Sequence, residues 1–464
     1  MWKEIHITMI KDKLLQIKYK ILKIKNKFIT IKEMLINFKK KTTRKKVAIS
    51  MFTSFVILFV SYLICNTSVP LPNEMSLLQW GDITNYSLHG KKDTIPNEIF
   101  LINVSYDKQL VNYVDTDSMT LGNYAITDRQ KLYDFLNIAK KENNYKYILL
   151  DVFFEKGIVS DQDSILFHLI KSMDRVVIPI HEKKELQDSA ILYGKSAIGD
   201  HTTTFIETNF VRFKYLHDSV PSIPLKMYQD LNGGNINNFG FLYTSNNWIC
   251  KNGITLQLPL KINSDSDFTN EERLNSIKDT SVKRAKIFQL GTFLKTNSHY
   301  PISNRIKNKI VVIADFKNDK YETYTGSMPG AIILINAYYA LQRGDHIILG
   351  KYGERFLFYI LIAVVYFVTT LCYLNRFSLS SNIRNPWLKL LISFTSVGLL
   401  YWIIGVIAYI LFDTVYNFWL PIIIFPIIGG IIKIINLYKQ IYYEKNKSIS
   451  HVKSVSDVSD SGKA

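Results

Sequence analysis

The sequence predicts an α/β extracytoplasmic domain with a mostly parallel sheet, inserted between one N-terminal and three C-terminal transmembrane helices. Two observations predict this fold class. Long apolar runs lie near both ends of the 464-residue chain. Between them, short Ile-, Val- and Leu-rich runs alternate with segments of helical period, which is the pattern of βαβ units.

Four apolar runs are long enough to cross a membrane: residues 47–65, 356–374, 390–412 and 415–435. An α-helix rises ~1.5 Å per residue, so each run can span a hydrocarbon core of ~30 Å. No small-residue cleavage site follows the first run. The first run is therefore expected to be an uncleaved anchor rather than a signal peptide.

The excess of basic residues lies next to the predicted spans. Residues 1–46 carry a net charge of +12 and residues 354–464 a net charge of +5, whereas residues 66–353 carry only +1. Lys and Arg accumulate on the cytoplasmic side of membrane spans. We therefore expect a multi-pass protein of the bacterial inner membrane, with both termini in the cytoplasm and residues 66–353 in the periplasm. This distribution of charge argues against a nucleic acid partner.

Four apolar runs in the central domain predict strands that are buried on both faces. They are Glu98–Val104, Tyr147–Phe153, Arg175–Ile180 and Lys309–Ala314. Residues 182–305 are rich in Asn, Ser, Thr and Gly, and predict only weaker strands at Phe239–Tyr243 and Ile254–Leu258. We expect this middle segment to be an insertion or a second lobe.

Three segments of the central domain have a helical period. The first is Asp128–Lys140, with Thr127 as a possible N-cap, and the last is Gly330–Gln342. The second is Asp161–Met173, in which one apolar face is formed by Ile165, Leu166, Leu169 and Ile170.

The chain contains none of the common catalytic or metal-binding motifs. Its cysteines, Cys65, Cys250 and Cys372, have neither disulfide-framework nor zinc spacing, and its histidines are scattered singly. It has no P-loop, no dinucleotide fingerprint, no G-x-S-x-G and no H-E-x-x-H. We expect no cofactor and no metal, and we expect that the protein is not an enzyme.

Carboxylates are the chemically suggestive groups of the central domain. Asp151 and Asp315 end predicted strands, Asp319 follows closely, and Asp161 and Asp163 open a predicted helix. Because ligands bind beyond the carboxyl ends of parallel strands, these acids and Thr323 are candidates for one ligand-binding crevice. The alternative is structural: Asp161 and Asp163 cap the helix and the other acids hold loops together.

Residues 1–46 predict a basic amphipathic helix on the cytoplasmic side. Apolar residues recur at alternating spacings of four and three over residues 10–38. The flanking e positions of this heptad pattern are all lysine: Lys11, Lys18, Lys25, Lys32 and Lys39. Like charges would face each other in a self-paired coiled coil, so we expect residues 10–39 to bind anionic inner-leaflet lipid or an acidic cytoplasmic protein.

The order of several motifs resembles the CHASE domain of the second type, an extracellular sensory module found beside bacterial cyclases and histidine kinases. The resemblance covers about residues 69–350. Its N-terminal half is carried by Thr127-Asp-Arg129, Tyr147-Ile-Leu-Leu-Asp151-Val-Phe-Phe and Asp161-Gln-Asp-Ser-Ile-Leu. Its C-terminal half is carried by Lys309-Ile-Val-Val-Ile-Ala-Asp315-Phe, Asp319, Thr323 and Met328-Pro-Gly330. The arrangement of one span before the domain and three spans after it is also typical of that family.

Two departures from the family pattern bear on function. Tyr324 stands where the family often has a proline. No kinase or cyclase module follows the last span, since residues 436–464 are polar and serine-rich and predict a disordered cytoplasmic tail. The resemblance therefore implies a stand-alone sensor that acts on a separate effector.

Three functions are compatible with these features. We expect a sensory or scaffold protein whose periplasmic domain binds a ligand or an envelope partner and signals in trans to a separate effector protein. The first alternative is a structural subunit of a cell-envelope membrane complex. The second alternative is an envelope hydrolase that uses the carboxylates of Asp151 and Asp315. Convergent acids favour a sensor or an enzyme, and an exposed apolar surface favours a subunit.

Overall fold

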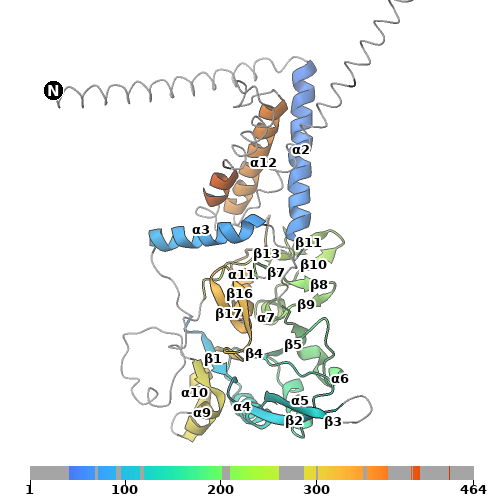
Figure 1. Cartoon of the computed structure of the whole chain (residues 1–464). Coiled ribbons are helices and arrows are strands. Elements are labelled where there is room, and N and C mark those ends of the chain that lie inside the picture. Colours follow the sequence, from blue (N-terminus) through green and yellow to red (C-terminus); the bar gives the residue numbers. More distant parts are fainter. Residues whose placement is uncertain are drawn as a thin grey trace, which may run out of the picture. The chain divides into compact units, whose positions relative to one another are not determined.

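The fold is described from a computed structural model of the chain (Figure 1). The described residues are 41–67, 72–89, 96–114, 120–200, 210–260, 287–298, 301–348, 353–374, 399, 401–407 and 438. The chain divides into two compact units. The small unit comprises Met1–Phe59, Ile360–Ser396 and Pro421–Ala464, and the large unit comprises Val60–Tyr359 and Val397–Leu420.

The large unit is built on a six-stranded sheet in which every neighbouring pair is parallel, in the order β14-β1-β15-β4-β5-β6. This confirms the predicted α/β class with a mostly parallel sheet. The strands are β1 (Ile99–Asn103), β4 (Tyr147–Asp151), β5 (Val176–Ile180), β6 (Ser196–Ile198), β14 (Ile287–Gln289) and β15 (Ile310–Ala314). Four of these six strands coincide with the predicted apolar runs, because each run is buried on both faces.

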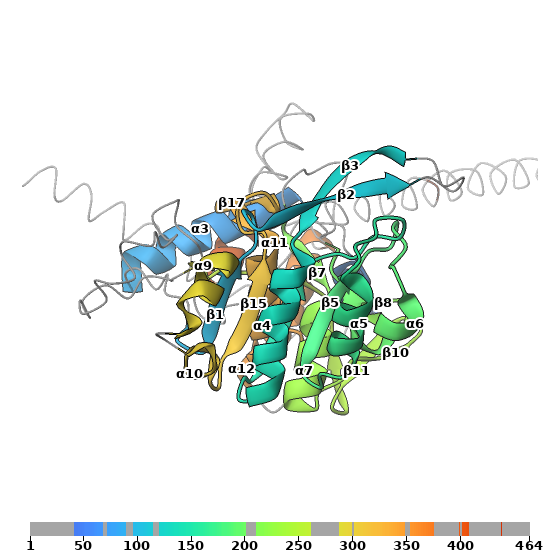
Figure 2. The ribbon, with the colours of Figure 1, turned by 90° about the horizontal axis from the view of Figure 1, so that it is seen from below.

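Helices cover both faces of this sheet, and alternate side chains along each strand point to opposite faces. Phe100 and Ile102 of β1 pack under α4 (Arg129–Glu142), α5 (Asp163–Lys171), α6 (Ser189–Leu192), α9 (Leu290–Lys295) and α10 (Ile302–Ile306). Figure 2 shows α4 and α5 in front of the strands. Ile99 and Leu101 belong to the core under α3 (Pro72–His89), α7 (Ile223–Asn232) and α11 (Gly330–Gln342).

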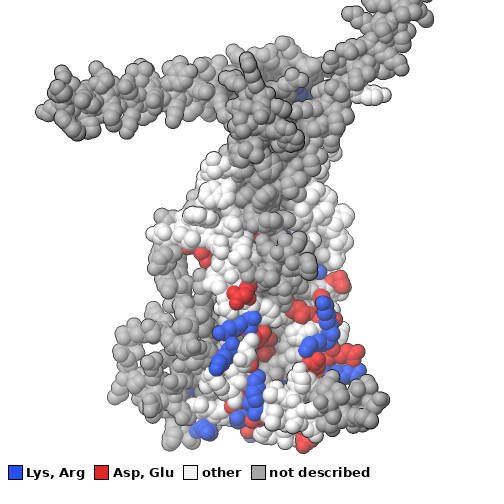
Figure 3. Space-filling view, in the orientation of Figure 1, with Lys and Arg blue, Asp and Glu red and all other residues white. Residues whose placement is uncertain are grey.

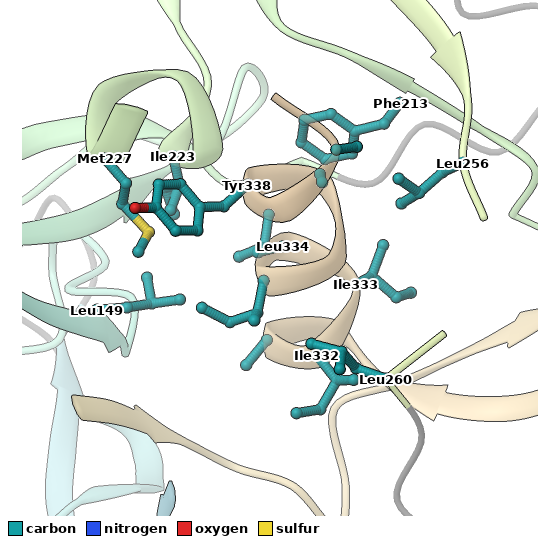
Figure 4. Packing of buried hydrophobic residues seen from close by; sticks show 14 of the residues in the cluster. Leu149, Phe213, Ile223, Met227, Leu256, Leu260, Ile332, Ile333, Leu334 and Tyr338 are labelled. Carbon is teal, nitrogen blue, oxygen red and sulfur yellow. The ribbon is translucent and has the colours of Figure 1, made fainter. Parts of the chain in front are cut away.

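α11 is the central helix of the second core. Ile332, Ile333, Leu334 and Tyr338 are fully or almost fully buried, and Figure 4 shows them surrounded by side chains of strands and of α7. The helix coincides with the predicted segment Gly330–Gln342. It is apolar on nearly all sides because it is enclosed by other elements of the fold.

Two of the predicted helix starts are wrong. The N-cap of α4 is Asp128 rather than Thr127, because the Asp128 carboxylate accepts a hydrogen bond from the Lys131 N–H at 3.0 Å. α5 begins at Asp163 rather than Asp161. Ile165 was expected on its apolar face but is 53% exposed, since Phe167 occupies the buried face in its place.

The middle segment of the large unit is not a separate lobe. It supplies β6, β14 and α7 to the main fold, together with a three-stranded antiparallel sheet. This small sheet consists of β10 (Asn237–Phe239), β11 (Leu242–Ser245) and β12 (Trp248–Cys250). The predicted strand Phe239–Tyr243 is therefore wrong: Gly240, at φ 77°, lies in the turn between β10 and β11. Of the predicted strand Ile254–Leu258, only the start is a strand, β13 (Gly253–Thr255), which pairs with β7 (Arg212–Lys214).

Three antiparallel pairs complete the large unit. They are β2 (Lys108–Val114) with β3 (Thr120–Thr127), β8 (Leu216–His217) with β9 (Val220–Pro221), and β16 (Lys320–Thr323) with β17 (Gly326–Pro329). Figure 2 shows β2 and β3 lying across the ends of the main strands.

One helix of the described residues is long and apolar enough to cross a membrane, the Arg44–Cys65 part of α2 (Lys41–Cys65). It contains the first predicted span. The second predicted span, residues 356–374, lies within the helix α12 (Gly353–Leu374), and the part of it with described side chains, Ile360–Leu371, is apolar. Of the predicted span 390–412, residues 399 and 401–407 are described and helical. The predicted span 415–435, the predicted helix over residues 10–39 and the tail, except residue 438, lie outside the described residues.

The end of α2 that belongs to the large unit is fastened to β7 by one arginine. Arg212 forms a buried ion pair with Glu74 of α3, and its Nη1 donates a hydrogen bond to the Ile64 carbonyl at 2.7 Å. The Asn252 N–H donates to Asn66 Oδ1 at 2.8 Å. A Cβ at Gly253 would lie 2.5 Å from the Cys65 carbonyl oxygen, so only glycine fits there.

Candidate ligand site at the carboxyl edge of the sheet

Polar residues line the carboxyl edge of the main sheet, where its parallel strands end. β14, β1 and β4 end on Gln289, Asn103 and Asp151, and β15 and β5 are followed by Asp315 and His181. After β15 the chain enters α11 on one face of the sheet, whereas after β4 it enters α5 on the other. Ala314 of β15 is in register with Asp151 of β4. Asp151 and Asp315 therefore lie at a topological switch point, the usual location of ligand sites in open parallel sheets.

Asp151 is the acid of this edge whose carboxylate charge is least balanced by hydrogen-bond donors and positive charges. Its Oδ2 atom is buried, and no hydrogen bond reaches it from the described residues. Burial raises the pKa of this carboxyl to about 7, and the negative charge of Asp319 adds to the increase, while His181 opposes it. Burial and the charge of Asp315 also raise the pKa of Asp319. Asp151 and Asp319 therefore share a buried environment in which holding a proton is favoured over holding two negative charges.

Asp315 is bound into the surrounding structure instead. It accepts hydrogen bonds from Ser105 Oγ at 2.5 Å, Lys108 Nζ at 3.0 Å and the Asn318 N–H at 2.9 Å. Burial alone would raise its pKa, but these donors outweigh burial and lower the pKa to about 2. Asp315 is thus an ionised anchor that joins the start of β2 to the loop after β15.

Two further groups belong to the same edge. The His181 ring lies 2.8 Å from the Asp200 carboxylate through Nδ1, and packs edge-on against the Phe153 ring at 4.6 Å between centroids. The Tyr321 hydroxyl donates a hydrogen bond to Asp319. His181 would have been found by the strand-end rule, because it directly follows a predicted strand. Asp200 comes after β6, which is too short to predict, and Tyr321 lies within β16, which is too polar to predict.

Asp163 has its own buried partner. Its Oδ1 lies 3.2 Å from Arg129 Nε, both side chains are almost fully buried, and its Oδ2 accepts from the Ser160 N–H at 2.8 Å. Burial raises the pKa of Asp163 and lowers the pKa of Arg129 to about 10. The Arg129 guanidinium also lies 4.4 Å from the centre of the Phe154 ring. Asp163 therefore serves a structural ion pair between α4 and α5.

The other two predicted site residues also have separate surroundings. Asp161 is exposed in the turn before α5. Thr323 closes the turn between β16 and β17, where its Oγ1 donates to the Gly326 carbonyl at 2.6 Å. Of the six predicted residues, Asp151, Asp315 and Asp319 are brought together at the carboxyl edge, and among these three the pKa is raised for Asp151 and Asp319.

The described residues contain no group of three or more His, Cys, Asp or Glu side chains that could hold a metal ion. On the face of the large unit in Figure 3, Lys and Arg side chains are interleaved with Asp and Glu side chains.

Family models, curated proteins and solved structures give no match to this chain. The chemistry of the carboxyl edge is therefore argued from its own atoms: two acidic groups beside an aromatic and an imidazole ring can accept hydrogen bonds from a cationic ligand.

Proposed function

We propose that this chain is a membrane-anchored sensor whose extracytoplasmic domain binds a positively charged ligand, or a positively charged side chain of an envelope partner, at Asp151 and Asp319. In this proposal it signals in trans to a separate effector, as a multi-pass protein of the bacterial inner membrane. The observation that carries the proposal is the buried Oδ2 of Asp151, which lacks a hydrogen-bond donor among the described residues.

The reason is energetic. A buried acceptor without a donor costs about 1–3 kcal/mol of folding free energy, more if it is charged. Proteins keep such an unfavourable group mainly at functional sites, where residues with a shifted pKa are concentrated. An ammonium or guanidinium group placed at Asp151 would donate the absent hydrogen bond and would relieve the repulsion from Asp319. A cation therefore gains more at this site than a neutral or anionic ligand.

The sensory role is supported by the sequence as well as by the site. The helix Arg44–Cys65 is long and apolar enough to serve as an anchor, and the motifs around Asp151 and Asp315 resemble a sensory domain of the CHASE type. A hydrolase using Asp151 with Asp315 is the weaker proposal, because Asp315 is already engaged by Ser105 and Lys108.

A structural subunit is the second candidate, and one observation favours it. The β2–β3 hairpin exposes Leu110 (72% exposed) and Tyr124 (53%), apolar side chains that a partner could cover. Under this alternative, Leu110→Asp would abolish co-purification of the partner, whereas Asp151→Asn would leave it unchanged.

Thermal unfolding of the full chain in detergent micelles tests the sensor proposal. Wild type is heated with lysine, arginine, putrescine or spermidine at pH 8, where the edge carboxyls are most ionised. We expect at least one of these cations to raise the unfolding temperature of wild type and of the control Asp161→Asn, whose carboxyl is exposed on the neighbouring loop. Asp151→Asn should abolish the increase. An equal increase in Asp151→Asn, or no increase with any cation, would contradict a cationic ligand at this site.

A further inference from the structure

The large unit contains a second place where a small ligand can bind, away from the residues discussed above. An open pocket of about 500 Å³ lies between the β8–β9 turn, the end of α7 and β10. Ligand pockets typically have volumes of about 300–1,000 Å³. Its floor is apolar, since Leu216 and Ile236 are buried, and its rim is polar.

The rim is lined by a chain of side-chain amides. Gln229 Nε2 donates to Asn235 Oδ1 at 2.8 Å, and Asn235 Nδ2 donates to Asn237 Oδ1 at 3.0 Å. This chain fixes the orientation of the three amides, so that Gln229 Oε1 and Asn237 Nδ2 stay available at its two ends. Asn238 adds a further amide to the lining. An amide offers both a donor and an acceptor, which matches a hydroxyl group that donates and accepts at once.

The charge of the lining restricts the ligand class. Among the described residues that line the pocket, Asp218, in the β8–β9 turn, is the one charged residue, and none is Lys, Arg or His. An anionic ligand would meet the carboxylate without a compensating cation. A single exposed carboxylate and several amides suit a neutral ligand that carries many hydroxyl groups.

An aromatic ring completes the pocket. Phe239 lines the pocket and is 65% exposed, so the free energy that burial of its large apolar ring would contribute to folding is not gained. The C–H face of a sugar ring is apolar while its edge is hydroxylated, so a sugar can pack against Phe239 and hydrogen-bond to the amides at the same time. Trp248, also exposed, lies in β12 of the same small sheet.

We propose that the pocket bounded by Asp218, Gln229, Asn235, Asn237, Asn238 and Phe239 is a binding site for a neutral carbohydrate. The site is independent of the carboxyl edge and uses none of its residues. A chain with both sites would have one pocket for a cation and another for a glycan.

Isothermal titration calorimetry of the full chain in lauryldimethylamine oxide micelles tests this proposal. Detergents with sugar headgroups are avoided because they would compete for the pocket. The probes are N-acetylchitohexaose, maltohexaose and mannohexaose, each with its monosaccharide. We expect at least one hexaose to bind with a Kd below 1 mM. Tighter binding of the hexaose than of its monosaccharide identifies a polymeric glycan as the source, and equal binding identifies a free sugar.

Matched variants assign the binding to the pocket. Phe239→Ala and Asn237→Ala should each weaken binding at least tenfold. The controls are Tyr193→Ala and Asn123→Ala, which remove an exposed aromatic ring and an exposed amide elsewhere in the large unit and should bind as wild type does. Failure of every probe to bind, or equal weakening by pocket variants and controls, would overturn the proposal.

Discussion

Asp319 lies one turn after Asp315, with its N–H donating to the Asp315 carbonyl at 3.2 Å, yet the two carboxyls have opposite pKa shifts. The pKa of Asp315 is lowered because Ser105, Asn318 and Lys108 outweigh its burial. The pKa of Asp319 is raised by burial and by the charge of Asp315 itself. One loop therefore holds an acid that stabilises the fold as an anion and another that favours its protonated form, next to Asp151.

The first prediction concerns the pH dependence of stability. The folded-state pKa of Asp151, about 7, is above its unfolded value, so the protonated carboxyl favours folding and its ionisation opposes it. The free energy of unfolding should therefore fall as the pH rises from the ordinary pKa of an aspartate carboxyl, 3.8, to about 7, and should level off above about 7. Asp151→Asn should abolish part of this fall and be about 1–3 kcal/mol more stable than wild type at pH 8. Denaturant unfolding at pH 5, 6, 7 and 8 measures the difference; a variant that is equally destabilised at every pH would contradict it.

The second prediction concerns the buried Arg129–Asp163 pair. Asp163→Asn leaves a buried guanidinium without its counter-charge and should cost about 3–5 kcal/mol of unfolding free energy. The double variant Arg129→Met with Asp163→Leu removes both charges and should recover most of that loss. Equilibrium denaturation of the full chain compares the two, and a double variant as unstable as the single one would rule out uncompensated charge as the cause.

The third prediction concerns Arg212. Arg212→Ala removes the positive charge paired with the buried Glu74 carboxylate and one donor to the Ile64 carbonyl, so it should cost about 3–5 kcal/mol. Amide hydrogen exchange of residues 60–67 should accelerate more than exchange in β4 or β15. The control is Arg343→Ala, which removes a partly exposed ion pair with Asp345 and should cost less than about 1 kcal/mol. Equal effects of the two substitutions would show that the Arg212 contacts do not hold this segment.

The fourth prediction concerns topology. Because the basic excess lies at the two ends of the chain, phosphatase fusions after Lys46 and Ser448 should be inactive and a fusion after Asn209 should be active. Green fluorescent protein fusions at the same positions should give the reverse pattern. Phosphatase activity at either end would mean that the orientation is wrong.

The fifth prediction concerns the basic amphipathic helix predicted over residues 10–39, which lies outside the described residues. A peptide of residues 1–46 should be mostly unfolded in dilute buffer and helical on vesicles with anionic lipid. Replacing Lys11, Lys18, Lys25 and Lys32 with Glu should abolish binding to the vesicles, and high salt should weaken binding of the wild-type peptide. Circular dichroism with and without vesicles measures both. A wild-type peptide that is helical and dimeric without lipid would indicate a coiled-coil stalk instead.

The pattern of apolar residues along the sequence predicted those strands that are buried on both faces of the sheet. The runs at β1, β4, β5 and β15 are apolar at every position before their last residue because helices cover both sheet faces. β6 and β14 have only three residues each, which is too short for a pattern to emerge. The turn at Gly240 was mistaken for strand because its neighbours Phe239 and Phe241 are as β-favouring as a strand interior.

The candidate site was predicted in position but not in detail. The strand-end rule located Asp151 and Asp315, since it depends only on where strands stop. It could not distinguish Asp315 from Asp319, because the donors that neutralise Asp315 come from Ser105 and Lys108, more than two hundred residues earlier in the chain. Contacts of that separation are decided by tertiary packing, which no local pattern encodes.

The contacts of Arg212 also decide where the large unit starts. Hydropathy places the border between anchor and domain at Cys65, but the domain's own hydrogen bonds reach back along α2 to Tyr62, whose hydroxyl donates to the Cys250 carbonyl at 3.1 Å. A soluble fragment that starts at residue 66 would lose the Ile64 carbonyl that accepts from Arg212 at 2.7 Å and the Cys65 carbonyl that lies over Gly253. A fragment for crystallisation should therefore begin inside the apolar helix, near Val60, with its exposed apolar positions made polar.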